Sequence, residues 1–304
     1  MTAPLLISMP GNERMTAQLA DSLGADTGHL DIRKFPDGET YLRFATEPAG
    51  RPLVIVCTLP DPDAKIVPLL FAAATARELG ATTVGLISPY LAYMRQDRRF
   101  KPGEAVTSRE VARLLSEAFD WLATVDPHLH RYSSLSEIYT IPTRVVHAAP
   151  MISAWIRSHV ENPLIIGPDS ESEQWVSEVA RDTNAPYTVL QKVRHGDRDV
   201  EVAIKDRDYL SGRIPVLVDD IISSGRTMLE AVRVIVAAGR TRPICVAVHG
   251  IFADQADKLL AQEGARMASQ RNRLLAAIGA ILAGLHGPIA CAKLNRRAFR
   301  HHRR

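Results

Sequence analysis

The sequence predicts an α/β fold with two domains, each a mostly parallel sheet flanked by helices. Short apolar runs alternate with helical patterns through most of the chain, which is typical of parallel strands joined by helices. The chain has 304 residues, more than the roughly 100 to 200 of a typical single domain. Because there are enough strands for two sheets, we expect one sheet in each half.

The first series of elements lies in the N-terminal half. We expect strands at residues 4–9, 51–59, 82–90 and 121–128. The helices of this series are expected at residues 12–24, 63–80 and 108–118. Asn12 stands where a helix cap is needed and Gly24 where the helix ends, because Asn side chains accept from first-turn N–H groups and Gly adopts left-handed backbone angles.

The second series lies in the C-terminal half. We expect strands at residues 162–170, 185–193, 214–220 and 242–252, and helices at residues 172–182, 226–239 and 254–264. The segment TIPTRVVHAAP, near residues 140 to 150, separates the two series. We therefore expect an N-terminal domain over residues 1–145 and a C-terminal domain over residues 146–285. Residues 286–304 are expected to be a disordered basic tail.

The composition, 46% apolar and 23% charged, is ordinary for a soluble globular protein. No run approaches the roughly 20 apolar residues that span a bilayer. The N-terminus lacks the basic start and long apolar stretch of a signal peptide. Cys57, Cys245 and Cys291 lie far apart, which argues against a disulfide framework or a zinc knuckle. We expect a cytoplasmic protein without a membrane segment.

The charge is unevenly distributed along the chain. Glu263 is the last acidic residue, and nine basic residues follow it. Without those nine, the chain has 28 basic and 34 acidic residues, a balance of −6. A basic tail can indicate nucleic acid or an acidic membrane as a partner. The rest of the chain has no basic stripe with interleaved aromatic residues, so nucleic-acid binding is not expected.

The stretch VLVDDIISSGRTM, residues 216–228, combines two chemical demands. Backbone N–H groups around Ser223 to Thr227 would face an anion at the positive end of a helix dipole. The carboxylates of Asp219 and Asp220 cannot bind phosphate and need hydroxyls or a cation. Ribose 5-phosphate, with vicinal hydroxyls and a phosphate, satisfies both demands. The alternative is a solvated acidic turn before a serine-rich helix start.

Polar residues at the carboxyl ends of the expected strands are further site candidates, because ligands collect there in open parallel sheets. This rule selects Arg95, Gln96, Asp126, His128, Asp169, Lys192, Asp219 and Asp220.

Several motifs together resemble one enzyme family. VLVDDIISSGRT resembles the phosphoribosyl diphosphate (PRPP) motif shared by type I phosphoribosyltransferases and PRPP synthases. The motifs that look like PRPP synthase, or ribose-phosphate diphosphokinase, are KFPDGETYLRF (34–44), SPYLAYMRQDRRFKPGE (88–104), VDPHLH (125–130), IIGPDS (165–170) and VHGIF (248–252). The set covers most of the chain in the right order and is most similar to the short archaeal-type branch.

The resemblance implies transfer of diphosphate from ATP to the C1 hydroxyl of ribose 5-phosphate, with Mg²⁺ as cofactor, giving PRPP and AMP. It also implies type I phosphoribosyltransferase-like domains, the N-terminal one binding nucleotide and the C-terminal one ribose 5-phosphate, in a homo-oligomer built from dimers. The ATP-binding residues would be Phe35, Asp37, Gly38, Glu39, Arg95, Gln96 and Asp97. The ribose-5-phosphate-binding residues would be Arg194, Asp219, Asp220, Ser223, Ser224, Gly225, Arg226 and Thr227. Lys192 and Arg194 would be catalytic, and His128 and Asp169 would bind the metal.

Each of these motifs taken alone also has a plainer interpretation. FPDGE suits an ordinary Asp-Gly hairpin turn, and RQDRR suits a solvated basic loop. Lys192 and Arg194, two residues apart on a strand, would project to one face, yet they can equally be solvated charges. His128 suits a structural role, and His130 is a weaker candidate for the same metal site.

Two alternatives to an active synthase follow from the same residues. One is a catalytically weak homologue that binds ribose phosphate or nucleotide and regulates a partner. The other is a phosphoribosyltransferase acting on a base, which the RQD segment and the two-domain length disfavour. The main departure from the family is the acid-free end of the chain, in which residues 271–285 can form a terminal helix. Arg226, where many members have Gly, either contacts phosphate or crowds the loop.

Overall fold

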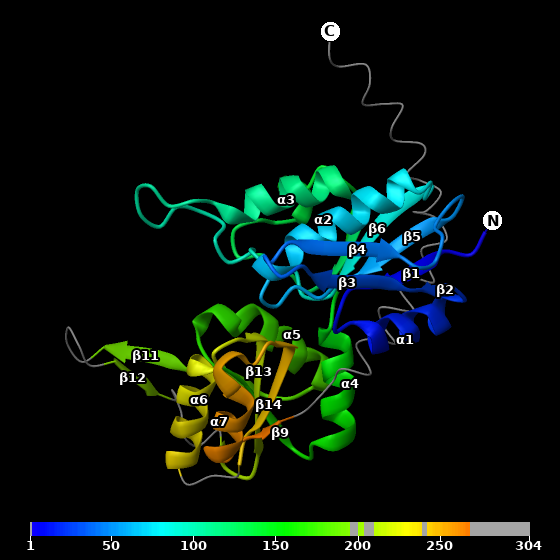
Figure 1. Cartoon of the computed structure of the whole chain (residues 1–304). Coiled ribbons are helices and arrows are strands. Elements are labelled where there is room, and N and C mark those ends of the chain that lie inside the picture. The colour runs from blue at the N-terminus through cyan, green and yellow to red at the C-terminus, as the bar shows by residue number, and fades with distance from the viewer. Residues whose placement is uncertain (1, 195–199, 204–209, 239–241, 268–304) are drawn as a thin grey trace. The chain divides into compact units, whose positions relative to one another are not determined.

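The computed structural model describes residues 2–194, 200–203, 210–238 and 242–267, and only the backbone of residues 174, 191–194 and 200–203. This part of the chain divides into two compact units, which meet in sequence between Val146 and His147 (Figure 1). Both units are built on parallel sheets, as predicted. Among the described helices, none has the length and apolar character needed to cross a membrane.

The first unit contains a six-stranded parallel sheet in the order β2-β1-β5-β6-β7-β8. Its strands are β1 (Leu5–Ser8), β2 (Asp26–Gly28), β5 (Pro52–Val56), β6 (Thr83–Ser88), β7 (Trp121–Val125) and β8 (Thr143–Val146). The central strands are continuous apolar runs, such as LVIV of β5, because helices cover both faces of the sheet. These helices are α1 (Glu13–Leu23), α2 (Asp63–Glu78) and α3 (Thr107–Ala118), with α1 opposite the other two (Figure 1).

Two short strands form a separate antiparallel ribbon in this unit. The ribbon consists of β3 (Leu30–Lys34) and β4 (Thr40–Phe44), paired from Leu30 with Phe44 to Lys34 with Thr40. Its partly buried apolar side chains pack on the core of the first unit. The β7–β8 connection contains the short helix η1 (Leu135–Glu137), and the segment expected to separate the domains contributes β8, a strand of the first sheet.

The predicted cap of the first helix is only half correct. Gly24 ends α1 with left-handed backbone angles, and its N–H donates to the carbonyl of Ala20. Asn12 precedes the helix but does not cap it with its side chain. Its amide instead donates to the carbonyl of Met9 at 3.1 Å, and its Oδ1 accepts from the N–H of Thr58 at 2.9 Å. Asn12 therefore ties the loop after β1 to the loop after β5.

The second unit contains a five-stranded parallel sheet in the order β10-β9-β13-β14-β15. Its strands are β9 (Pro163–Gly167), β10 (Tyr187–Val189), β13 (Ile214–Ile222), β14 (Ile244–Gly250) and β15 (Arg266–Met267). The helices are α4 (Ala149–His159), α5 (Glu173–Thr183), α6 (Arg226–Ala237) and α7 (Ala256–Gln262), with short helices η2 (Ser170–Ser172) and η4 (Ala253–Gln255). A second antiparallel ribbon pairs β11 (Gln191–Arg194) with β12 (Val200–Ala203).

Strand β13 is longer than the sequence predicted. The expected strand ended at Asp220, whereas β13 continues through Ile221 and Ile222. The continuation arises because Ile221 and Ile222 pair with the last residues of β14. Asp219 and Asp220 therefore lie inside a strand, with backbone positions held by the sheet rather than by a turn.

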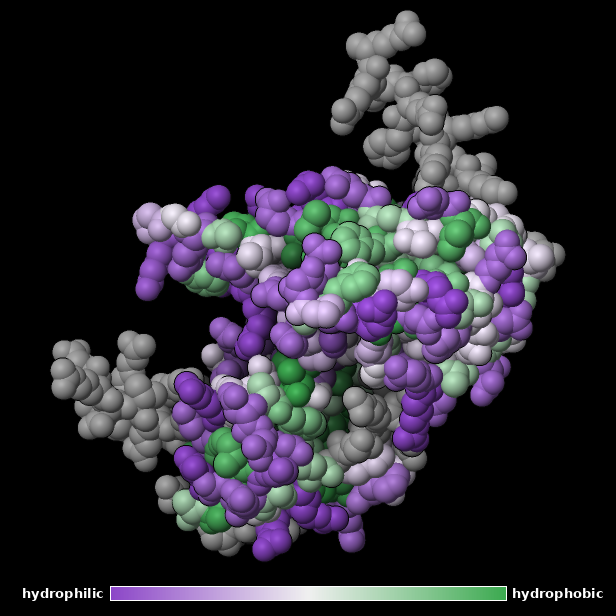
Figure 2. Space-filling model, viewed as in Figure 1, coloured by the Kyte–Doolittle hydropathy of each residue, from purple (hydrophilic) through white to green (hydrophobic). Residues whose placement is uncertain are grey.

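The predicted helix at residues 271–285 and the basic tail at residues 286–304 lie outside the described residues. On the face shown in Figure 2, hydrophilic side chains predominate. Apolar side chains also reach the surface on α2, where Val67 and Phe71 are each 49% exposed.

Candidate functional site

The FPDGE motif forms the tip of the β3–β4 ribbon. The N–H of Phe35 donates to the carbonyl of Glu39 at 2.8 Å, and the N–H of Gly38 donates to the carbonyl of Phe35 at 2.9 Å. Gly38 has a φ of +93°, which favours glycine. Asp37 accepts from the N–H of Glu39 through Oδ1 at 3.1 Å. The motif is thus a hairpin turn, and the turn presents an exposed aromatic ring beside two exposed carboxylates.

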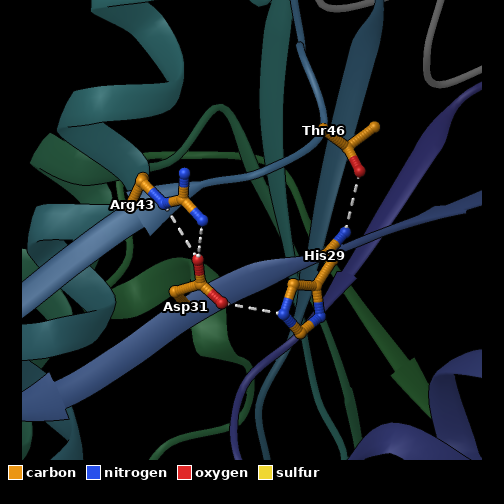
Figure 3. Close-up of polar contacts among 4 residues, drawn as sticks. All are labelled: His29, Asp31, Arg43 and Thr46. Atoms are coloured by element: carbon orange, nitrogen blue, oxygen red, sulfur yellow. Dashed lines mark hydrogen bonds and ion pairs between the residues drawn. The ribbon is translucent and has the colours of Figure 1, made fainter.

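Cross-strand contacts hold this ribbon in register below its tip. The guanidinium of Arg33 lies 4.7 Å from the ring centre of Phe35 and 4.1 Å from that of Tyr41. Farther along, Asp31 lies between Arg43 and His29, at 2.6 and 2.9 Å (Figure 3). Hydrogen bonds from Arg43, and secondly from His29, hold the pKa of the Asp31 carboxyl below its usual value. These contacts fix the part of the ribbon from which the FPDGE turn extends.

The RQD segment lies in the loop between β6 and α3. Arg95 is exposed, as expected for a ligand-binding cation. Gln96 is half-buried, and its Oε1 accepts from the hydroxyl of Thr107 at 3.1 Å. Asp97 differs from both, since its side chain is only 1% exposed and is paired with Arg131. In this structure Asp97 contacts protein, so a direct ATP contact for it stays a prediction.

His128 and His130 lie in the loop after β7. Their ring centres are 3.8 Å apart, and His130 is the more exposed of the two. Asp126, at the start of the loop, has a φ of +31°, and its N–H donates to the carbonyl of Val146 at 3.0 Å. The carboxyl end of β7 thus presents imidazoles, as the strand-end rule predicted.

Three carboxylates gather at the carboxyl ends of β9 and β13, which are neighbours in the sheet of the second unit. Asp169 follows β9 and caps η2, where its Oδ1 accepts from the N–H groups of Glu171 at 3.1 Å and Ser172 at 3.3 Å. Burial, and then the charges of Asp220 and Asp169, raise the pKa of Asp219 to about 8. Asp219 therefore keeps its proton near neutral pH, and a bound cation would favour its charged form.

The segment after β13 leads directly into α6. Ser223, Ser224 and Thr227 are half-buried, and Arg226 is exposed. Gly225 precedes the helix with a φ of +72°, and no side chain among the described residues caps the helix start. A Cβ at Gly225 would lie 2.9 Å from the Cβ of Ala256, so the position lacks room for a side chain. First-turn N–H groups without a side-chain cap favour an anion at this end of α6.

Lys192 and Arg194 lie on β11, opposite Val202 and Val200 of β12. The single strand expected at residues 185–193 is instead two strands: β10 belongs to the five-stranded sheet, and β11, which carries the pair, belongs to the separate β11–β12 ribbon.

The residues that support the RQD segment were not predicted from the sequence. Arg131 and Tyr132 follow the HLH stretch, and both contact Asp97. Asp97 and Arg131 are 34 positions apart, so no local pattern joins them. The one feature of the sequence that connects them is that Asp97 and Arg131 each follow a strand, and the two strands, β6 and β7, are neighbours in the sheet.

Comparisons with known proteins define the class of this chain. Residues 5–118 match the N-terminal domain of ribose phosphate pyrophosphokinase, and residues 134–276 match the phosphoribosyl transferase domain. The fold resembles the crystal structure of phosphoribosylpyrophosphate synthetase from Mycobacterium smegmatis, with a TM-score of 0.79 and 22% identity. That match covers 97% of this chain and all of the other.

Curated relatives identify the family more closely. The chain is 34% identical to ribose-phosphate pyrophosphokinase of Methanothermobacter thermautotrophicus, over 83% of this chain and 87% of the relative. It is 36% identical to that of Methanopyrus kandleri, over 82% and 85%. The chain belongs to the ribose-phosphate pyrophosphokinase family, which confirms the resemblance to the archaeal-type branch and the α/β fold with a phosphoribosyltransferase-like domain.

Proposed function

We propose that this chain is a ribose-phosphate diphosphokinase, which transfers diphosphate from ATP to the C1 hydroxyl of ribose 5-phosphate and releases AMP. One observation carries the proposal: in the domain that matches phosphoribosyl transferases, a carboxylate pair on β13 is followed by a helix start without a side-chain cap. Asp219 and Asp220 suit the sugar hydroxyls. The N–H groups and hydroxyls of Ser223 to Thr227 suit the phosphate.

The nucleotide contacts are assigned to the first unit. Phe35 supplies a ring for the adenine at the ribbon tip, and Asp37 and Glu39 supply acceptors for its amino group. Arg95 and Gln96 supply contacts to ATP after β6. Support comes from the exposure of Phe35 and Arg95 and from the match of residues 5–118 to the pyrophosphokinase N-terminal domain.

We assign Mg²⁺ as the cofactor. Carboxylate oxygens are the ligands it prefers, and Asp169 fits because both hydrogen bonds described for its carboxylate use Oδ1 and not Oδ2. Burial, and then the charges of Asp220 and Asp169, raise the pKa of Asp219, so a bound cation would favour its charged form. Imidazole suits Mg²⁺ less well, so His128 acts through water or on phosphate. Bound Mg²⁺ would neutralise charge on the transferring diphosphate.

Lys192 and Arg194 are assigned to the transferring group. Diphosphate transfer needs positioning and charge neutralisation rather than protein-bound intermediates. Lysine provides a mobile point charge and arginine a bidentate clamp. Replacing Lys192 by Ala should lower turnover about 100-fold or more and change ATP affinity little, since the interaction belongs to the transition state. An unchanged turnover would refute the assignment.

The direct test is incubation of the protein with ATP, ribose 5-phosphate and Mg²⁺. We expect AMP and PRPP in equal amounts, and no AMP when ribose 5-phosphate is omitted. A phosphoribosyltransferase would instead consume PRPP together with a base. A regulatory homologue would bind ribose 5-phosphate, measured by calorimetry, without forming PRPP.

The assembly and location are proposed with the activity. We propose a cytoplasmic homo-oligomer built from dimers, as the resemblance to the family implies. Light scattering of the purified protein measures its mass in solution, and a monomer of 33.4 kDa would contradict this assembly.

A further inference from the structure

An ion pair with a buried carboxylate joins the loops that follow β6 and β7, two neighbouring strands of the first sheet. Asp97 follows β6 and Arg131 follows β7. The Nη1 of Arg131 donates to both carboxylate oxygens of Asp97, at 2.9 and 3.0 Å. The Asp97 side chain is 1% exposed and that of Arg131 is 41% exposed. A carboxylate this deeply buried depends on its partner, because an unpaired charge in the protein interior is strongly unfavourable.

A tyrosine next to the arginine provides a second link. The hydroxyl of Tyr132 donates to the carbonyl of Asp97 at 3.2 Å and lies 3.1 Å from the hydroxyl of Ser108. Tyr132 and Ser108 are both buried. Ser108 lies in the first turn of α3, so the loop after β7 contacts both ends of the segment that runs from Asp97 to α3.

The start of α3 also holds Gln96. The N–H of Ser108 donates to the carbonyl of Gln96 at 3.4 Å, and the hydroxyl of Thr107 donates to its side-chain oxygen at 3.1 Å. The exposed Arg95 therefore extends from a segment whose next two residues are fixed by hydrogen bonds.

We infer that Arg131 is a positioning residue for the nucleotide, an inference that rests on the proposed function. Through Asp97, it fixes Arg95 and Gln96 relative to the loop that carries His128. The two loops leave adjacent strands separately, and the ion pair makes them one unit. Phosphoryl-group transfer is sensitive to such spacing, since a displacement of about 1 Å can reduce the rate about 100-fold.

The main test replaces Arg131 by Met, which keeps much of the side-chain bulk and removes the charge. We expect the dissociation constant of a non-hydrolysable ATP analogue to rise about 10-fold and turnover to fall about 30-fold to 100-fold. The dissociation constant of ribose 5-phosphate, measured by calorimetry, should stay within about twofold of the unmodified protein, since its contacts are assigned to the second unit. An ATP affinity and turnover equal to those of the unmodified protein would overturn the inference.

A double variant keeps the test decisive if Arg131→Met folds poorly. Asp97→Asn combined with Arg131→Gln replaces the ion pair by two neutral amides and leaves no buried charge unpaired. We expect this variant to fold, as measured by circular dichroism, and to bind the ATP analogue more tightly than Arg131→Met. If Arg131→Met folds and the double variant binds the ATP analogue no more tightly, pairing with Asp97 is not what positions the loop. If Arg131→Met does not fold, the same conclusion follows when the double variant binds the analogue as tightly as the unmodified protein.

Two further variants separate the ion pair from its surroundings. Arg131 also lies 5.3 Å from the ring centre of Phe100, so Phe100→Leu tests whether that contact is responsible. Arg113→Met removes a guanidinium from an exposed pair with Glu117 on α3. Both variants should bind the ATP analogue like the unmodified protein. A loss in Phe100→Leu equal to that in Arg131→Met would assign the effect to the ring and overturn the inference.

Failure of the positioning role and failure of the proposed function can be distinguished, because binding of the ATP analogue and formation of PRPP are measured separately. If the unmodified protein binds the ATP analogue but forms no PRPP, the proposed function fails. The positioning role is still tested by analogue binding to the Arg131 variants.

Discussion

The carboxyl of Asp219 should make the folded protein less stable as pH rises when no divalent cation is present. Burial and the charges of Asp220 and Asp169 raise its pKa from 3.8 to about 8. Between these values the folded chain keeps a proton that the unfolded chain releases. The unfolded state then binds fewer protons, so the free energy of unfolding falls as pH rises through this window.

The size of the effect follows from the shift. At about 1.4 kcal/mol per pKa unit, a full shift from 3.8 to about 8 corresponds to ~6 kcal/mol. Asp219 is half-buried and in contact with solvent, which screens the charges, so we expect a loss of ~2–3 kcal/mol. Asp219→Asn has no charge to gain. The free energy of unfolding of this variant should therefore not fall with pH, and at about pH 8 it should be higher than that of the unmodified protein by ~2–3 kcal/mol.

The assay is urea unfolding followed by tryptophan fluorescence, with EDTA, at several values between about pH 5 and pH 8. Trp155 and Trp175 report on the second unit. Adding Mg²⁺ at the highest pH should restore stability to the unmodified protein and have little effect on Asp219→Asn. Asp257→Asn, which removes an exposed carboxylate on α7, is the control and should behave like the unmodified protein. An equal fall in stability for Asp219→Asn would refute the electrostatic reasoning.

Three further predictions concern folding and reactivity. Gly225→Ala should lose ~1–2 kcal/mol of stability, because of its positive φ and the close approach to Ala256; calorimetry should also show weaker binding of ribose 5-phosphate. Asp120→Ala should cost ~3 kcal/mol in urea unfolding, since it leaves the N–H of Val84 without its side-chain acceptor. Cys57 should resist iodoacetamide in the folded protein at about pH 8, because burial raises its pKa to about 12, and mass spectrometry after labelling measures this.

The alternation of apolar runs and helical patterns was enough to predict two parallel sheets, because their central strands and covering helices are local patterns, but the edge strands β2, β8 and β15 were not predicted. Helix α4 was not predicted, although Ile152 and Ile156 have the i, i+4 spacing of a buried helix face. The segment contains Pro150 and begins at the expected domain boundary, where no helix was predicted. The predicted end of β13 was also wrong, because its last residues are held in the strand by pairing with β14.

The candidate site shows the same division between local and long-range information. Asp219, Asp220 and Gly225 belong to one continuous motif whose chemistry is visible in the sequence. Asn12 was predicted as a cap, whereas its side chain bonds Thr58, 46 positions away. Interactions between distant parts of the chain depend on how the sheet packs, and the periodicity of the sequence does not predict them.

If a sugar phosphate binds at the start of α6, the supply of that metabolite would affect the stability of the protein. A sugar phosphate at this position would accept from first-turn N–H groups that have no side-chain cap in the described part of the chain. Occupancy at 100 times the dissociation constant would add about 2.7 kcal/mol to the folded state. Cells short of pentose phosphate would then hold this enzyme in its least stable, most readily degraded form.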